Sequence, residues 1–114
     1  MNGEMLNIVF STEDPLGNTV NLYDSGLLHV ETGHPELKGH SAVIRETVED
    51  PDYIYVSNKV ATRDEFLSFG VHPNYPNLYV VVIVERKMDA VVTAYVQKKS
   101  PTTKRGLKYD KSSK

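Results

Sequence analysis

Cysteine is absent from this chain of 114 residues, which excludes a disulfide framework. That composition is compatible with a reducing compartment, and we expect a cytoplasmic protein. Long apolar runs are also lacking: the longest, residues 80–84, is far short of a membrane span. No membrane partner is therefore expected. The length suits one hydrophobic core and is too short for two ordinary domains.

The charges are unevenly distributed, although the formal net charge is only −2. Residues 1–97 hold six basic and fourteen acidic side chains, whereas residues 98–114 hold seven basic ones against Asp110 alone. A basic terminus can attract a phosphate backbone by releasing its counterions. The alternative is a solubilising tail. We expect the folded domain to occupy residues 1–109 and a disordered basic tail to follow at 110–114.

The first half of the chain predicts a hairpin and two helices. Two β-prone runs, 6–10 and 19–23, flank a turn-rich segment. Asp24 or Ser25 can cap a helix that stops at Gly33, because Pro35 cannot continue it. A second helix is predicted over 37–49, before Asp50-Pro51. Its stripe would be Leu37, His40, Ser41, Ile44, Thr47 and Val48.

The second half predicts a four-stranded antiparallel meander. Its strands are expected at 53–57, 78–85, 90–97 and 106–109, with a loop and one helical turn within 58–76. The fold class is therefore α+β, with the hairpin and two helices packed on the sheet. In strand 90–97, alternation places Ala90, Val92, Ala94 and Val96 toward the core and Val91, Thr93, Tyr95 and Gln97 on the other face.

The segment 26–36 is the most informative one, because it combines two histidines and two glutamates at a predicted helix end. Histidine is the side chain best suited to proton transfer near neutral pH. His29 and His34 are therefore the first candidates for chemistry. The hydroxyl-bearing face of strand 90–97 is the second part of the candidate site.

Four short motifs occur in one order: His34-Pro35-Glu36, the run IRETVEDPD at 44–52, the strand YVVV at 79–82 and Thr93-Ala94-Tyr95. In order and spacing they resemble the phage and bacterial branch of the barnase, EndoU, colicin and RelE (BECR) nuclease superfamily, over residues 19–109. The resemblance implies a helical portion on a four-stranded antiparallel sheet and RNA cleavage without a metal. One departure is Gly33, where the family often has a basic residue.

This resemblance predicts a metal-independent ribonuclease or toxin-like nuclease domain of phage or mobile-element origin, with no cofactor. The expected partners are RNA, single-stranded or tRNA-like, and an inhibitor or antitoxin protein. Attack by the ribose 2′-hydroxyl needs a base, an acid and stabilisation of the phosphorane. We predict His34 and His29 as the acid–base pair and Thr93 and Tyr95 as donors to the phosphate. Candidates for substrate binding are Arg45, Arg86, Gln97, Lys98 and Lys99.

Two other classes of function stay open. The first is a metal-binding protein that uses His29, Glu31, His34, Glu36 and His40. The spacing of His29 and His34 argues against it, because five residues turn a helix by roughly 140°. The second is a catalytically inactive module that binds RNA or a protein on the same fold. Structural roles also compete at each position, since threonine and tyrosine are ordinary strand formers.

Overall fold

The computed structural model describes residues 7–99 and 106–113. Its strands are β1 (Ile8–Glu13), β2 (Thr19–Tyr23), β3 (Tyr53–Val56), β4 (Arg63–Phe69), β5 (Tyr79–Glu85), β6 (Ala90–Gln97) and β7 (Leu107–Asp110). Its helices are α1 (Asp24–Gly33) and α2 (Ser41–Glu49), with 3-10 turns η2 (Pro35–Leu37) and η3 (Lys111–Ser113).

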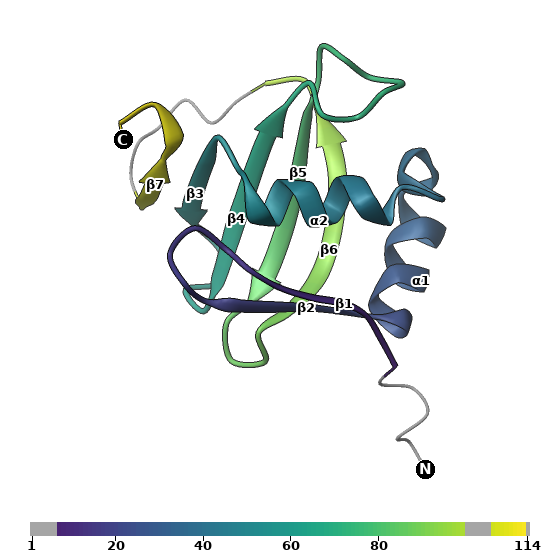
Figure 1. Ribbon diagram of the computed structural model, residues 1–114, viewed down its shortest axis with the longest axis horizontal. Coiled ribbons are helices and arrows are strands. Elements are labelled where there is room, and N and C mark those ends of the chain that lie inside the picture. Colours follow the sequence, from purple (N-terminus) through teal and green to yellow (C-terminus); the bar gives the residue numbers. More distant parts are fainter. Residues whose placement is uncertain (1–6, 100–105, 114) are drawn as a thin grey trace.

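The strands form one mixed sheet in the order β1-β2-β6-β5-β4-β3-β7. Neighbours are antiparallel except β2 and β6, which run parallel and meet at Asn21 and Ala90. β1 and β2 cross β3–β6 at a steep angle, so the sheet curls around its core (Figure 1). The class is α+β as expected. The prediction of a four-stranded antiparallel meander is wrong, because the hairpin joins the same sheet through β6 and β4 adds a further strand.

β4 lies in the segment that was expected to be a loop with one helical turn. Its sequence RDEFLSF does not show a clean polar alternation, because Asp64 and Ser68 are buried on the core side with Phe66. Asp64 is neutralised there by Arg86 and Lys108, which lie 22 and 44 residues away in sequence. Ion pairs between distant residues therefore make this strand unreadable from its local pattern.

The second helix is shorter than the predicted 37–49. Gly39 adopts a positive φ of 78°, a conformation that a glycine takes without steric cost and that interrupts a helix. The chain therefore forms η2 first, and α2 begins at Ser41. The buried stripe of α2 consists of Val43, Ile44, Thr47 and Val48.

The two faces of the sheet have different surroundings. On one face α2, α1 and the β1–β2 hairpin enclose the main core, which includes Phe10, Leu22, Ile44 and Phe66. Figure 1 shows α2 lying across this face and α1 beside β6. The opposite face, here called the open face, has a smaller apolar cluster. Its centre is Tyr55, Leu67, Val81 and Ile83, with Tyr53, Tyr79, Val92 and Tyr95 half-buried around it.

A bulge in β6 sets which of its side chains reach the open face. Ile83 pairs with Thr93 whereas Val84 pairs with Val91, so the register shifts by one residue. Val91 consequently packs in the main core and Val92 on the open face, contrary to the strict alternation expected from the sequence. Tyr95 packs on the open face as the alternation predicts.

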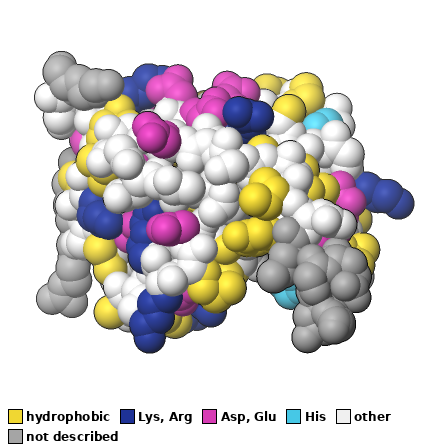
Figure 2. All heavy atoms as spheres, turned by 60° about the horizontal axis from the view of Figure 1, so that its bottom comes forward, with side chains coloured by type: hydrophobic (Ala, Val, Ile, Leu, Met, Phe, Trp, Pro, Cys, Tyr) yellow, Lys and Arg dark blue, Asp and Glu magenta, His cyan; other side chains and the backbone are white. Residues whose placement is uncertain are grey.

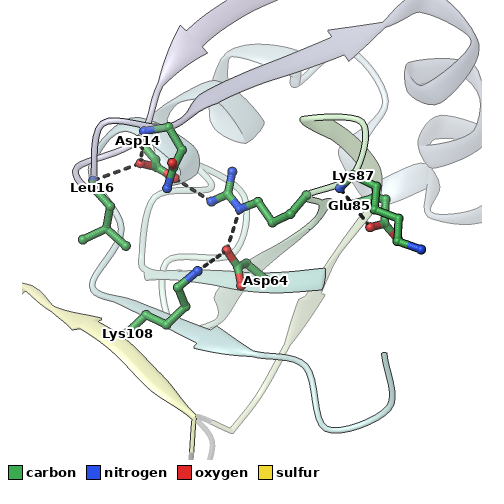
Figure 3. A network of polar contacts seen from close by, with 8 residues as sticks. Asp14, Leu16, Asp64, Glu85, Lys87 and Lys108 are labelled. Atoms are coloured by element: carbon green, nitrogen blue, oxygen red, sulfur yellow. Dashed lines mark hydrogen bonds and ion pairs between the residues drawn. The ribbon is translucent and has the colours of Figure 1, made fainter. Parts of the chain in front are cut away.

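A polar network joins the hairpin turn to β4, β7 and the turn after β5 (Figure 3). Arg86 donates from Nη2 to Asp14 and from Nε to Asp64, each at 2.6 Å. Lys108 Nζ donates to Asp64 at 2.8 Å. The side chains of Asp14 and Asp64 are only 0% and 3% exposed, so these cations stabilise carboxylates that burial would otherwise penalise.

Part of the terminus expected to be a disordered tail has regular structure. Asp110 ends β7, where it pairs with Tyr53, and residues Lys111–Ser113 form η3. Lys111 Nζ also contacts Asp50 at 2.9 Å. Lys104, Arg105 and Lys114, which belong to the same basic segment, lie outside the described residues. Across 7–99 and 106–113, none of the helices has the length and apolar character needed to cross a membrane.

Candidate active site

His34 stands at the junction of α1 and η2, where its backbone is held on both sides. Its N–H donates to Val30 O at 2.7 Å, and its carbonyl oxygen accepts from Leu37 N–H at 2.9 Å. Pro35 disfavours helical dihedral angles at the preceding residue, and His34 accordingly has φ −136° and ψ 74°. The reversal turns the imidazole away from the helix axis while its backbone stays anchored.

Two contacts fix this junction against the sheet. At Gly26 an added Cβ would lie 3.2 Å from the carbonyl oxygen of Val91, so the glycine allows α1 to approach β6 closely. Leu37, at the end of η2, is fully buried in the main core. The edge of β6 beyond its single bridge to β2 is therefore lined by α1 and η2.

The imidazole of His34 meets the phenol of Tyr95 at this edge. Their ring centroids are 5.7 Å apart with an interplanar angle of 40°. His34 Nδ1 lies 3.8 Å from Glu36 Oε2, and the His34 side chain is 36% exposed. The ring is therefore positioned by a carboxylate and an aromatic neighbour, while part of it stays accessible to a ligand.

Tyr95 also lines a cavity of about 320 Å³ on the open face, which we call the Glu65 cavity. Its polar walls are Glu65 and Arg63 from β4, Thr93 from β6 and the 57–60 loop. Glu65 pairs across the sheet with Ile83, and Ile83 pairs with Thr93. The structure thus brings Thr93 and Tyr95 to one cavity, with His34 in contact with its Tyr95 wall.

The environment changes the proton affinity of two groups in this cavity. Burial raises the pKa of Glu65 above its ordinary value of 4.5, and Lys59 and a hydrogen bond with Ser57 oppose this only in part. Burial also raises the pKa of Tyr95, with a further contribution from the negative charge of Glu65. Near neutral pH the phenol is therefore a proton-bearing donor, and Glu65 is a stronger base than an exposed glutamate.

Three residues that the sequence suggested for this site lie elsewhere. His29 is exposed on α1, five positions before His34. Arg45 lies on α2, where its guanidinium contacts Glu49 at 2.9 Å and covers the ring of Phe10. Arg86 covers the ring of Phe66 on the core side of the sheet. The interpretations of His29 as an acid–base partner and of both arginines as substrate ligands are therefore corrected.

The remaining candidates follow one another at the end of β6. Gln97 pairs with Tyr79 across the sheet, and its Nε2 donates to the carbonyl oxygen of Lys99 at 2.7 Å. Lys98 and Lys99 are exposed immediately after the strand. These residues stand at the opposite end of β6 from the turn that carries Lys87 and Met88, and they can contact a ligand only if it extends along the open face.

Sequence reasoning missed Glu65 and Arg63, which became visible only when β4 formed. Arg63 donates from Nε to Glu85 Oε1 at 3.1 Å and lines the cavity. The order Arg63, Glu65, Leu67 has the period of one strand face and was the available signal. It was obscured by the buried Asp64 between them.

His72 supports the site from behind, although no role is predicted for it from the sequence. Its side chain is buried, Nδ1 accepts from Asn74 N–H at 3.1 Å, and Nε2–H donates to the carbonyl oxygen of Glu36 at 2.7 Å. His40 stacks on it with ring centroids 4.2 Å apart. His72 thereby fixes η2, from which Glu36 reaches toward His34.

The histidines and glutamates of the proposed metal set are separated by these contacts. Glu31 accepts from Gly39 N–H at 2.9 Å, Glu36 lies beside His34, and His40 packs on His72. Within the part of the chain that the structure describes, no three His, Asp or Glu side chains are grouped as metal ligands.

Figure 2 shows how charge is distributed on one side of the molecule. Lys and Arg side chains lie there in separate spots next to Asp and Glu, with hydrophobic side chains between them. On this view, the described residues do not present one continuous basic strip. A nucleic acid on that side would meet mixed charge.

The comparisons with known proteins identify no relatives. No family model matches the chain, and no curated protein matches it either.

Proposed function

We propose that this domain is a metal-independent ribonuclease or toxin-like nuclease of the BECR type, of phage or mobile-element origin, that cleaves RNA through its 2′-hydroxyl. The observation that carries the proposal is the convergence of His34, Tyr95 and Glu65 at one edge of the open face. These side chains supply an imidazole, a phenol and a carboxylate of raised pKa. They are the groups that such a reaction uses for proton transfer and charge stabilisation.

In this mechanism Glu65 is the general base and His34 the general acid. The Glu65 carboxylate takes the proton of the ribose 2′-hydroxyl, and the 2′-oxygen forms a bond to phosphorus. The bond from phosphorus to the 5′-oxygen breaks, and the His34 imidazolium gives its proton to that oxygen. The products are a 2′,3′-cyclic phosphate and a free 5′-hydroxyl. Glu65 thus takes the role that the sequence suggested for His29.

The other polar groups of the cavity stabilise the negative charge of the phosphorane. The Tyr95 phenol and the Thr93 hydroxyl can donate hydrogen bonds, and Arg63 brings a positive charge to the same cavity. Preorganised donors of this type act most strongly where charge develops in the transition state.

One observation favours the second candidate, a catalytically inactive RNA-binding or protein-binding module. Arg63 is already paired with Glu85 at 3.1 Å, and Gly33 precedes His34 where a cation would help. The positive charge available to a phosphorane is therefore reduced.

The deciding experiment incubates the protein with end-labelled RNA in excess chelator and resolves the products. We expect cleavage that ends in cyclic phosphate, and we expect it to be lost in Glu65→Gln. Glu46→Gln, the same change on the exposed side of α2, is the matched control and should cleave normally. Activity that returns only with added metal ion would contradict the mechanism. Absence of cleavage with retained RNA binding would favour the binding module.

A further inference from the structure

The open face has a second cavity, of about 210 Å³, at the other side of the sheet from His34. We call it the Tyr79 cavity. It lies between Tyr79 of β5 and Tyr53 of β3, and its remaining walls are Asp52, Asp110, Lys111 and Ser112. Two aromatic rings and two carboxylates therefore meet in one recess, and none of these groups takes part in the cleavage mechanism.

Both tyrosine rings are held in place by a second aromatic ring. Tyr79 packs edge-on against Phe69 with centroids 5.0 Å apart, and Tyr53 packs against Tyr55 at 5.9 Å. Behind them lie Leu67 and Val81, which are buried. Half-buried, rigid rings on a sheet surface offer flat apolar area at little entropic cost, which suits stacking with planar ligands.

The carboxylates of this cavity decide which part of a nucleotide can enter. Asp52 Oδ2 accepts from Phe69 N–H at 2.8 Å, and Asp110 Oδ1 accepts from Ser112 N–H and Oγ at 3.0 and 2.7 Å. Lys111, the cation in the wall, contacts Asp50. A phosphate would be repelled by the two acids, whereas the amino group of a base can donate to them.

The register places this cavity at a defined separation from the reacting groups. Tyr95 pairs with Val81, Val81 with Leu67, and Leu67 with Tyr53. Three strand spacings separate Tyr95 from Tyr53, which amounts to about 14 Å. One ligand that engages both His34 and the Tyr79 cavity must therefore be longer than a mononucleotide.

We propose that the Tyr79 cavity is a base-binding subsite that stacks one nucleobase of single-stranded RNA between Tyr53 and Tyr79 and selects bases carrying an exocyclic amino group. This inference rests on the proposed function, because it takes RNA as the ligand of the same face. Duplex RNA is excluded, since its bases are stacked inside the helix. Uracil lacks the amino group and binds less well.

The test uses the full chain carrying His34→Ala, so that RNA is not consumed, and measures fluorescence anisotropy with labelled hexa-adenylate, hexacytidylate and hexauridylate. We expect the adenine and cytosine oligomers to bind several-fold more tightly than the uracil oligomer. Tyr79→Leu should weaken binding of hexa-adenylate roughly ten-fold, whereas Tyr79→Phe keeps the ring and should bind normally. Asp52→Asn should reduce the preference over uracil.

Tyr75→Leu is the matched control, because Tyr75 is an exposed tyrosine that lies in the loop before β5 and contacts His72. Tyr53→Leu repeats the test on the other wall if Tyr79→Leu fails to fold. Equal affinity for the uracil and adenine oligomers, or no loss in either Leu variant beyond that of Tyr75→Leu, overturns the proposal.

The same measurements separate this proposal from the proposed function. If the unmodified chain does not cleave RNA but binds with the stated preferences, the nuclease fails and the subsite stands. If it cleaves RNA while both Leu variants bind normally, only the subsite fails. If it neither binds nor cleaves, both are wrong.

Discussion

The imidazole of His34 lies 5.7 Å from the phenol ring of Tyr95, centroid to centroid, although 61 positions separate them in sequence. His34 comes from the end of α1, and Tyr95 comes from the edge of β6 that α1 and η2 line. This contact connects the helical layer to the Glu65 cavity, and the predictions about activity depend on it.

Replacing His34 by Ala should lower the RNA cleavage rate by roughly 10²- to 10⁴-fold, the usual contribution of a general acid. RNA affinity should change little, because one imidazole adds little attraction to a polyanion. Single-turnover kinetics and anisotropy measure the two quantities separately. His29→Ala, on the exposed side of α1, should leave both unchanged. A loss of rate in His29→Ala equal to that in His34→Ala would restore the sequence-based pairing and contradict the structure.

The pH dependence of cleavage should show the raised pKa of Glu65. As the base, Glu65 must be deprotonated, so the rate should fall as the pH decreases through its pKa. Because burial raises that pKa, the acidic limb of kcat/KM should lie above 4.5, the ordinary glutamate value. A limb at or below that value would show that Glu65 is not the base.

Glu65 should also reduce stability at neutral pH. Its folded-state pKa is raised, so the folded protein holds the proton more tightly than the unfolded chain and loses stability as the pH rises through that window. Glu65→Gln removes this effect. Its Tm should exceed that of the unmodified protein at pH 7, and the difference should disappear at pH values below the window. A lower Tm at pH 7 would contradict the sign of the shift.

Arg86→Ala should lower the free energy of unfolding by about 3 kcal/mol, because the buried carboxylates of Asp14 and Asp64 lose a shared partner. Urea denaturation measures the change. Arg45→Ala is the control: its pair with Glu49 is exposed, so a change of about 0.5 kcal/mol or less is expected. Arg86→Lys should not restore stability fully, since one ammonium cannot reproduce two fixed guanidinium contacts. Equal losses in Arg86→Ala and Arg45→Ala would be inconsistent with the buried network.

Lys98 and Lys99 should contribute affinity by neutralising phosphates at the end of β6. The double change to Ala should weaken RNA binding and flatten its salt dependence, by roughly 0.7 in log–log slope for each phosphate of a single strand that is no longer neutralised. Lys87→Ala plus Met88→Ala, in the turn at the other end of β6, is the matched control. An unchanged slope in the Lys98/Lys99 variant would mean that both lysines only solubilise the chain.

Truncating the basic terminus would not isolate electrostatic binding. Leu107–Asp110 form β7, which pairs with β3, and Lys108 contacts the buried Asp64. Removing them would take away an edge strand and a partner of a buried carboxylate together. The exposed lysines are therefore the better probes of charge.

Local signals in the sequence determined the elements whose causes are local. Pro35 after Gly33-His34 ends α1 where expected, and the apolar runs at 79–85 and 90–97 are strands because β-branched residues pack well on a pleated surface. Such signals also pointed to His34, Thr93 and Tyr95, each of which stands on an element or junction with a clear local pattern.

Only the tertiary structure decided the sheet and the chemical partner of His34. Asp64 is buried on β4 because Arg86 and Lys108 neutralise it from distant segments, and without those cations its sequence reads as a loop. The formation of β4 brings Glu65 and Arg63 to the open face. The bulge in β6 and the parallel pairing of β2 likewise depend on contacts between strands. Local propensity does not encode contacts between segments far apart in sequence, and in this protein those contacts complete the candidate site.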